Sequence, residues 1–87
     1  MNSIYKFPLS VADESEIKMP SGSEILTVQV QDNKICIWAK VDLESTTLQV
    51  RTFRVVGTGH AFDPKLTYIG TVLIGLFVWH IFEVPIQ

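Results

Sequence analysis

Hydrophobic and polar residues alternate with a period of two along much of this chain. The clearest run is EILTVQVQ at 24–31, in which Leu26, Val28 and Val30 face one side and polar residues face the other. Because successive side chains of a β-strand point to opposite faces, this run predicts a half-buried strand. The 3.6-residue period of an amphipathic helix does not occur along the sequence. We therefore expect an all-β protein with little or no helix.

Turn sequences separate the strand-like runs at close spacing. Two of them stand out, Pro20-Ser21-Gly22-Ser23 and Asp32-Asn33-Lys34, and the second is typical of a tight hairpin. The segments that fit strands are 4–9, 17–19, 24–31, 35–43, 48–56, 66–73 and 76–84. Short strands interrupted this often favour an antiparallel arrangement. We expect about five to seven strands in a small sandwich or a barrel-like sheet.

The length of 87 residues indicates one domain spanning residues 1–87, because two cores would each be too small to be stable. Cys36 is the only cysteine, so a disulfide within the chain is excluded. One unpaired thiol suits a reducing compartment. The N-terminus lacks the basic segment and apolar run of a signal peptide, and we expect a cytoplasmic protein.

The segment from Leu66 to Phe82 contains no Asp, Glu, Lys or Arg, and its length approaches that of a short membrane-spanning helix. Gly70 and Gly75 interrupt it, and no cluster of basic residues flanks it to orient an insertion. The segment is also rich in β-branched and aromatic residues, which strands favour. We predict a buried hairpin that turns near Gly75, and no contact with a membrane.

The apolar content of 47% is high for a chain of this size, whereas charged residues make up 18%. In the last strand both faces are apolar, with Phe77, Trp79 and Ile81 on one and Val78, His80 and Phe82 on the other. A small domain can cover one such face with its own core and leaves the other to water or to a second subunit. We predict a homo-oligomer with Val78, His80 and Phe82, or alternatively the face of Trp79, at the interface.

The formal net charge of −2 arises from nine acidic and seven basic residues, and the basic residues are scattered along the chain. Proteins that bind nucleic acid nonspecifically carry a basic stripe or patch, because the phosphate backbone dominates that affinity. We therefore expect no direct binding to DNA or RNA.

The motif GTGHAFDP at residues 57–64 offers the best candidate for a ligand site. Gly57 and Gly59 permit close approach of the backbone to a ligand, and His60 can donate or accept a hydrogen bond. The structural alternative is a wide turn in which the glycines only supply positive φ angles. Arg51 and Arg54 precede the motif on opposite faces of one strand, so without a bulge they cannot clamp one phosphate together. One of them can bind an anion, and the structural alternative is a surface arginine paired with an acid on a neighbouring strand. The predicted ligand residues are Arg51, Arg54, Gly57, Gly59 and His60.

Other chemistries find little support in the sequence. A zinc site would need at least three protein ligands, and His60, His80 and Cys36 lack a recognisable metal-binding spacing. Strand context favours an inert Cys36 thiol, and no serine nucleophile motif occurs. We therefore expect neither a metal nor a cofactor, and we do not expect an enzyme.

Several motifs together resemble a family of short, uncharacterised proteins encoded in bacteriophage and prophage genomes. The motifs that carry this resemblance are Tyr5-Lys6-Phe7-Pro8-Leu9, Met19-Pro20-x-Gly22, Trp38-Ala39-x-Val41-Asp42, Arg51-Thr52-Phe53, Gly57-Thr58-Gly59-His60, Tyr68-Ile69-Gly70-Thr71 and Phe77-Val78-Trp79-His80-Ile81-Phe82-Glu83. The resemblance spans nearly the whole chain and implies no catalytic residues. It implies instead a phage accessory protein that acts in the host cytoplasm.

Such accessory proteins often counter host defence by binding. Our first hypothesis is a protein that sequesters a small, anionic, nucleotide-derived signal in a pocket formed by the Gly57–His60 turn, an arginine and aromatic residues. The alternatives are an inhibitor that binds a host defence enzyme, and a structural subunit of the virion. A pocket containing an arginine with His60 would favour the first hypothesis, and a flat apolar patch would favour the inhibitor.

Overall fold

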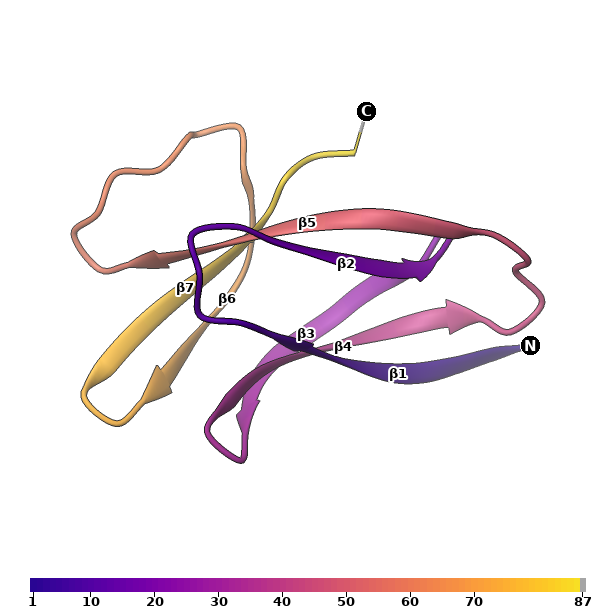
Figure 1. Ribbon diagram of the computed structural model, residues 1–87, viewed down its shortest axis with the longest axis horizontal. Helices are drawn as coiled ribbons and strands as arrows, with labels where there is room; N and C mark the ends of the chain where they lie inside the picture. The colour runs from indigo at the N-terminus through magenta and orange to yellow at the C-terminus, as the bar shows by residue number, and fades with distance from the viewer. Residues whose placement is uncertain (87) are drawn as a thin grey trace.

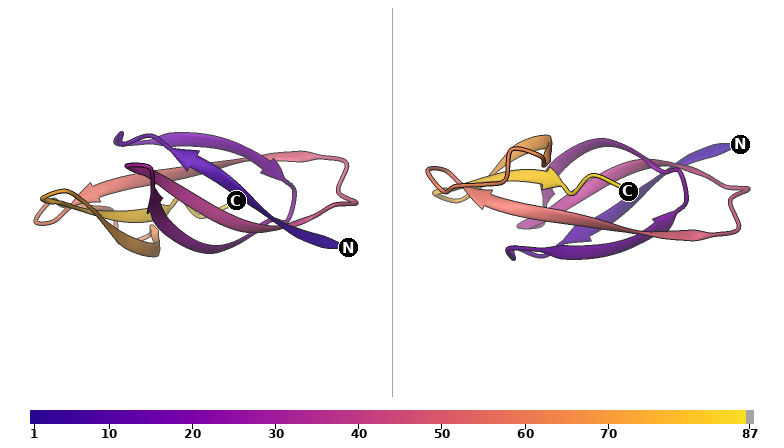
Figure 2. Two further views of the ribbon diagram at one scale, coloured as in Figure 1. Left: turned by 90° about the horizontal axis from the view of Figure 1, so that it is seen from below. Right: turned by 90° about the horizontal axis from the view of Figure 1, so that it is seen from above.

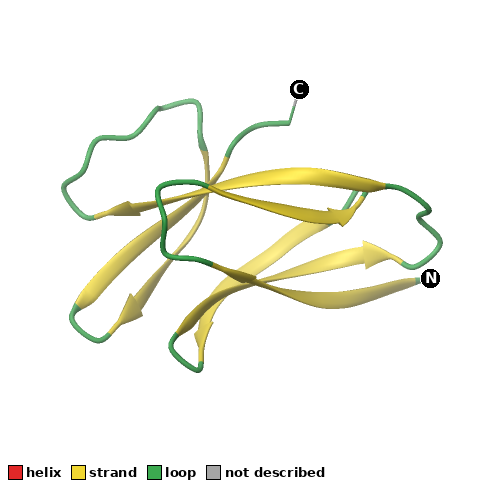
Figure 3. Ribbon diagram, in the orientation of Figure 1, coloured by secondary structure: helices red, strands yellow, loops and turns green. Residues whose placement is uncertain are grey.

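A computed structural model describes residues 1–86 and contains seven antiparallel strands (Figures 1 and 3). They are β1 (Asn2–Leu9), β2 (Ser15–Pro20), β3 (Glu24–Gln31), β4 (Lys34–Asp42), β5 (Leu48–Gly57), β6 (Thr67–Ile74) and β7 (Phe77–Glu83). No helix occurs within these 86 residues. The prediction of an all-β fold is confirmed, and the two short N-terminal segments are strands as well.

The strands form two sheets that together make a sandwich-like fold. One sheet has the order β1-β4-β3, and the other has the order β2-β5-β7-β6. The molecule is thin, with extents of 41 × 30 × 16 Å, and Figure 2 shows it edge-on. In Figures 1 and 2 the β6–β7 hairpin and the loop after β5 lie at one end of the long axis. The candidate site lies at this end.

Two tight turns fix the local hairpins. Asp32 and Asn33 both have positive φ angles, 52° and 61°, which is the conformation of a type I′ turn between β3 and β4. Gly75, with φ of 58°, opens the two-residue turn between β6 and β7. The segment that resembled a membrane helix is therefore a hairpin, as predicted, but it is not buried throughout, because Leu73 and Leu76 are exposed. Within the described part of the chain no helix is long and apolar enough to span a membrane.

The core lies between the two sheets and takes side chains from both. Met19, Ile35, Ile37, Phe53 and Ile81 are fully buried there. Ile35 and Ile37 point inward on β4, and Phe53 points inward on β5. A sheet pair of this kind buries one face of each strand and leaves the other to solvent.

One face assignment is wrong. Leu26 was expected to point inward with Val28, but it is exposed, because a register shift between Ile25 and Thr27 reverses the alternation at that point. A second shift, between Tyr68 and Gly70, occurs on β6, which lies alongside β3. A Cβ on Gly70 would lie only 2.7 Å from Cγ1 of Val28, so the absence of a side chain allows this close packing.

Candidate functional site

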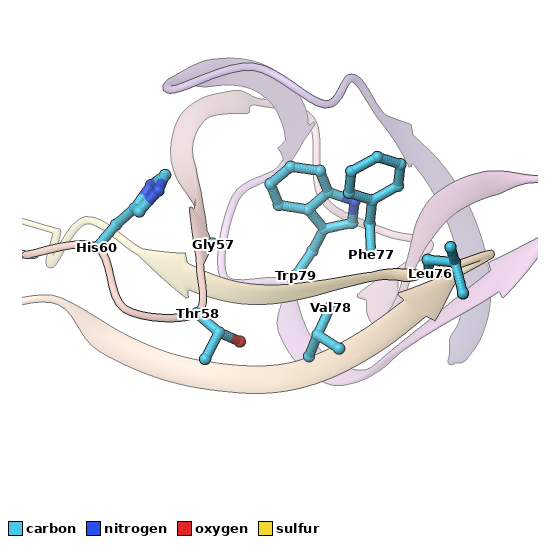
Figure 4. Close-up of a pocket in the computed structure, with 7 residues that line it drawn as sticks. All are labelled: Gly57, Thr58, His60, Leu76, Phe77, Val78 and Trp79. Atoms are coloured by element: carbon cyan, nitrogen blue, oxygen red, sulfur yellow. The ribbon is translucent and has the colours of Figure 1, made fainter.

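A hollow adjoins the glycine motif where β5 ends beside the β6–β7 hairpin (Figure 4). It has a volume of about 470 Å³. We call it the aromatic pocket, and its lining residues are Gly57, Thr58, His60, Leu76, Phe77, Val78 and Trp79. The structure thus brings the predicted Gly57–His60 turn and the predicted Trp79 into one hollow.

Gly57 forms the floor of the aromatic pocket. It pairs with Trp79 across β5 and β7, and His60 returns over it because the His60 N–H donates to the Gly57 carbonyl at 3.1 Å. Atoms of the His60 imidazole and the Trp79 indole lie 3.4–3.5 Å from the point where a Cβ on Gly57 would be. A glycine at this position therefore leaves open the space between the two rings.

Phe77 extends the aromatic wall. Its ring stacks on Trp79 with centroids 5.8 Å apart and an angle of 15° between the planes. Trp79 packs partly against the core, whereas Phe77 is 63% exposed. Figure 4 shows His60, Trp79 and Phe77 pointing to one side of the sheet, and Thr58 and Val78 pointing to the other. The wall is held from behind by the core and is open in front.

Among the described residues, the lining of the aromatic pocket includes no Asp, Glu, Lys or Arg side chain. The site can therefore stack against a planar group and offer it hydrogen bonds from His60, but its lining contains no permanent charge to balance a phosphate.

Arg51 does not reach this pocket. It lies on the inner face of β5, 6% exposed, where Nε and Nη2 donate to the two carboxylate oxygens of Glu83, the second at 3.0 Å. Its Nη1 donates to the carbonyl of Ser23 at 2.7 Å. A guanidinium with these partners holds β5, β7 and the β2–β3 turn together. We therefore take Arg51 out of the candidate ligand site that the sequence suggested.

Arg54 faces the outer side of β5 and pairs with Glu14 at 3.0 Å. It shares a neighbouring hollow of about 250 Å³ with His60, and Asp13 and Asp63 also line that hollow. The acidic groups outnumber the single guanidinium there, so the local field does not favour an anion. Gly59 has a φ of 88° and serves the turn itself.

On the outer face of the hairpin, His80 is hydrogen-bonded to hydroxyl groups in a chain that was not predicted from the sequence. Its Nδ1 lies 2.9 Å from Oγ1 of Thr71, and its Nε2 lies 2.8 Å from Oγ1 of Thr58. The Tyr68 hydroxyl continues the chain to Thr71. Thr71 is the cross-strand neighbour of His80, so correct register between the last two strands would have revealed this pair.

The predicted interface residues have different surroundings. Phe82 is buried by the chain itself, because Phe62 of the loop after β5 lies on its ring with centroids 4.5 Å apart. Val78 points outward and is partly exposed, and Trp79 faces the pocket. Leu73 and Leu76, which the prediction omitted, are exposed at 66% and 98%. The apolar surface at this end is thus nearer to the hairpin turn than expected.

No group of three or more His, Cys, Asp or Glu side chains suited to a metal ion occurs in residues 1–86. The Cys36 thiol is buried on β4.

Comparison with known proteins gives one match. Neither the curated proteins nor the solved structures gave a match to this chain. The model of a family described as a domain of unknown function, DUF7352, matches residues 1–87. The resemblance to a family of uncharacterised proteins is thereby confirmed, and a phage origin stays a prediction. Because the match covers the entire sequence, the chain belongs to the DUF7352 family.

Proposed function

We propose that this domain is a non-enzymatic binding protein that holds a planar aromatic group in the aromatic pocket. The observation that carries the proposal is the open space between His60 and Trp79 above the bare backbone of Gly57. Ligand sites are usually concave, apolar and about 300–1,000 Å³ in volume, with a few polar groups that fix orientation. The pocket has this character, and His60 is its most versatile polar group.

The base of a nucleotide-derived molecule is the ligand group that suits this wall. Stacking of a base on an aromatic side chain contributes about 1–3 kcal/mol and tolerates any base, because every base has a π-face. His60 can then select among bases by donating or accepting one hydrogen bond. In this proposal the phosphate stays near solvent, in contrast to the anion site expected from the sequence.

The biological role follows only by association with the phage family that the sequence resembles. A small protein made in large amounts in the host cytoplasm can lower the free concentration of a signalling nucleotide without any chemistry. We propose sequestration of this kind as a means of countering host defence.

Tryptophan fluorescence tests the proposal directly. In a Trp38→Phe background Trp79 is the only tryptophan, and we expect adenosine, guanosine and their 5′-monophosphates to change its emission in a saturable manner. Gly57→Val should abolish the change, because its side chain fills the space between the two rings. The matched control is Val56→Ala, which alters the preceding position of the same strand. Saturable binding by Gly57→Val, or none by the parent protein, would contradict the proposal.

Arg54 separates two forms of the proposal. If the phosphate is recognised, Arg54→Gln weakens binding of the monophosphates and leaves binding of the nucleosides unchanged. If only the base is recognised, as we propose, the variant binds all four probes like the parent protein.

A second candidate function is inhibition of a host protein, favoured by the exposed apolar wall of Phe77 beside Leu76. An apolar side chain of the target would then occupy the aromatic pocket. Selection of random displayed peptides on the immobilised protein tests this candidate. We expect enriched peptides to contain an aromatic or large aliphatic anchor and to lose binding to Gly57→Val. Peptides that bind both proteins equally would count against it.

A further inference from the structure

The outer face of the β6–β7 hairpin is apolar near its turn. On β3 the outward positions include Gln29 and Gln31, as expected for a strand with one face in water. On the hairpin, the cross-strand neighbours Leu73 and Val78 both point outward into solvent. Leu76, at the turn that joins the two strands, is 98% exposed. The hairpin thus exposes apolar residues near its turn, where β3 exposes glutamines.

We define the hairpin face as the outward side chains of β6 and β7 together with the turn. Its members are Tyr68, Thr71, Leu73, Leu76, Val78 and His80. They are contiguous, since Leu73 lies opposite Val78, Thr71 lies opposite His80, and one pair, Ile74 and Phe77, separates Leu73 and Val78 from the turn. None of them is an Asp, Glu, Lys or Arg, and neither is any other residue from 66 to 82.

We infer that the hairpin face is the contact between two copies of this chain, related by a two-fold axis. A surface without charges is covered best by another surface without charges, because a charged group buried there would lose its hydration and gain no partner. A second hairpin face meets this requirement with the same residues, and a two-fold contact uses one patch twice. Two hairpins facing each other in this way form a small sheet-on-sheet contact.

The area is sufficient for such a contact. From the exposed fractions of its residues, the hairpin face offers on the order of 500 Å² per copy. The two copies together would bury on the order of 1,000 Å², which is the lower limit for a specific interface. We therefore expect a reversible dimer rather than an obligate one. A lipid surface fits less well, since anionic membranes attract basic residues and residues 66–82 contain no lysine or arginine.

The aromatic wall of the pocket faces away from the proposed contact, and only Leu76 and Val78 belong to both the pocket lining and the hairpin face. His60, Trp79 and Phe77 point to the opposite side of the sheet from Val78 (Figure 4). The inference therefore does not rest on the proposed ligand, and the two can fail separately. A Gly57→Val variant should lose ligand binding and keep its assembly, whereas Leu73→Lys, at a residue that does not line the aromatic pocket, should lose assembly and keep ligand binding.

Sedimentation equilibrium of the full chain tests the inference. The protein concentration is varied from about 1 to about 200 μM, which covers micromolar dissociation constants. We expect the parent protein to change from monomer to dimer within this range. Leu73→Lys should raise the dissociation constant at least tenfold, because it puts a charge at the centre of the contact. Leu48→Lys is the matched control, since Leu48 is also an outward leucine of the same sheet and is also 66% exposed. It is the first residue of β5, whereas the hairpin lies beside the last residues of that strand. This control variant should dimerise like the parent protein.

Val78→Lys provides a second variant on the neighbouring strand, and circular dichroism shows that each variant is folded. A parent protein that stays monomeric at about 200 μM, the highest concentration tested, would overturn the inference. So would equal effects of Leu73→Lys and Leu48→Lys. Binding of a monomeric parent protein to vesicles of phosphatidylcholine and phosphatidylglycerol, lost in Leu73→Lys, would also overturn it and assign the face to lipid.

Discussion

Removing the Arg51 guanidinium should destabilise the fold severely. In Arg51→Met a side chain of similar length fills the site, but the carboxylate of Glu83 loses both of its hydrogen bonds from Arg51, and the carbonyl of Ser23 loses its bond from Nη1. The Arg51 and Glu83 side chains are only 6% and 12% exposed, so water cannot easily replace the lost partner. The variant therefore leaves an unpaired charge in a buried position.

The magnitude can be worked from these contacts. Leaving one member of a buried ion pair without its partner costs about 3–5 kcal/mol. For 87 residues the whole stability is about 4–13 kcal/mol, so the loss takes a large share of it. In Arg51→Met/Glu83→Leu the unpaired charge is gone, and mainly the Ser23 carbonyl lacks its donor, which costs about 1–3 kcal/mol. The double variant should therefore be more stable than the single variant by about 2 kcal/mol.

Urea unfolding, followed by circular dichroism, measures both variants against the parent protein. A loss below about 1 kcal/mol in Arg51→Met would refute the argument that the pair is structural. So would a double variant whose loss equals the sum of the two single losses, because a coupled pair is not additive. The result also bears on function, since an arginine that served only a ligand would leave the stability of the free protein unchanged.

Three further predictions concern packing around the site. Gly70→Ala should lower the free energy of unfolding by about 1–3 kcal/mol, because the added methyl group overpacks against Val28. In a Val28→Ala background the loss should be smaller. Equal losses in both backgrounds, measured by urea unfolding, would contradict the contact. Gly57→Ala should stabilise the protein by about 0.4–1 kcal/mol, because a Cβ fits there in ordinary contact, and should weaken nucleoside binding in a fluorescence titration. Phe62→Ala should lower stability by about 1 kcal/mol and expose Phe82, seen as faster hydrogen exchange of β7 amides; unchanged exchange would mean that the loop does not protect the strand.

The local features of the fold could be predicted from sequence because their causes are local. The run at 24–31 matches β3 in full, and the turn at Asp32 and Asn33 has the expected positive φ angles. Leu26 could not be placed, because a bulge depends on how the neighbouring strand pairs. Alternation continues through a bulge in the sequence but not in space.

The site was predictable only in part. The Gly57–His60 turn meets Trp79, which was predicted for the subunit interface, because Gly57 and Trp79 are partners across two strands. The role of Arg51 depends on Glu83, 32 positions away, and its strand face alone could not distinguish a ligand contact from a buried pair. Likewise, the packing of Phe62 on Phe82 could not be predicted, because Phe62 lies in a loop whose sequence has no periodic pattern.

The close packing of β3 on β6 at Val28 and Gly70 affects how the protein avoids aggregation. These are edge strands of the two sheets, and an open edge invites pairing with the edge of another molecule. Because the two edges lie side by side, each hinders access to the other. The remaining edges, β1 and β2, each contain one proline and one lysine, which are common safeguards against such pairing. A chain this rich in apolar strands can therefore stay dispersed while its hairpin face stays apolar.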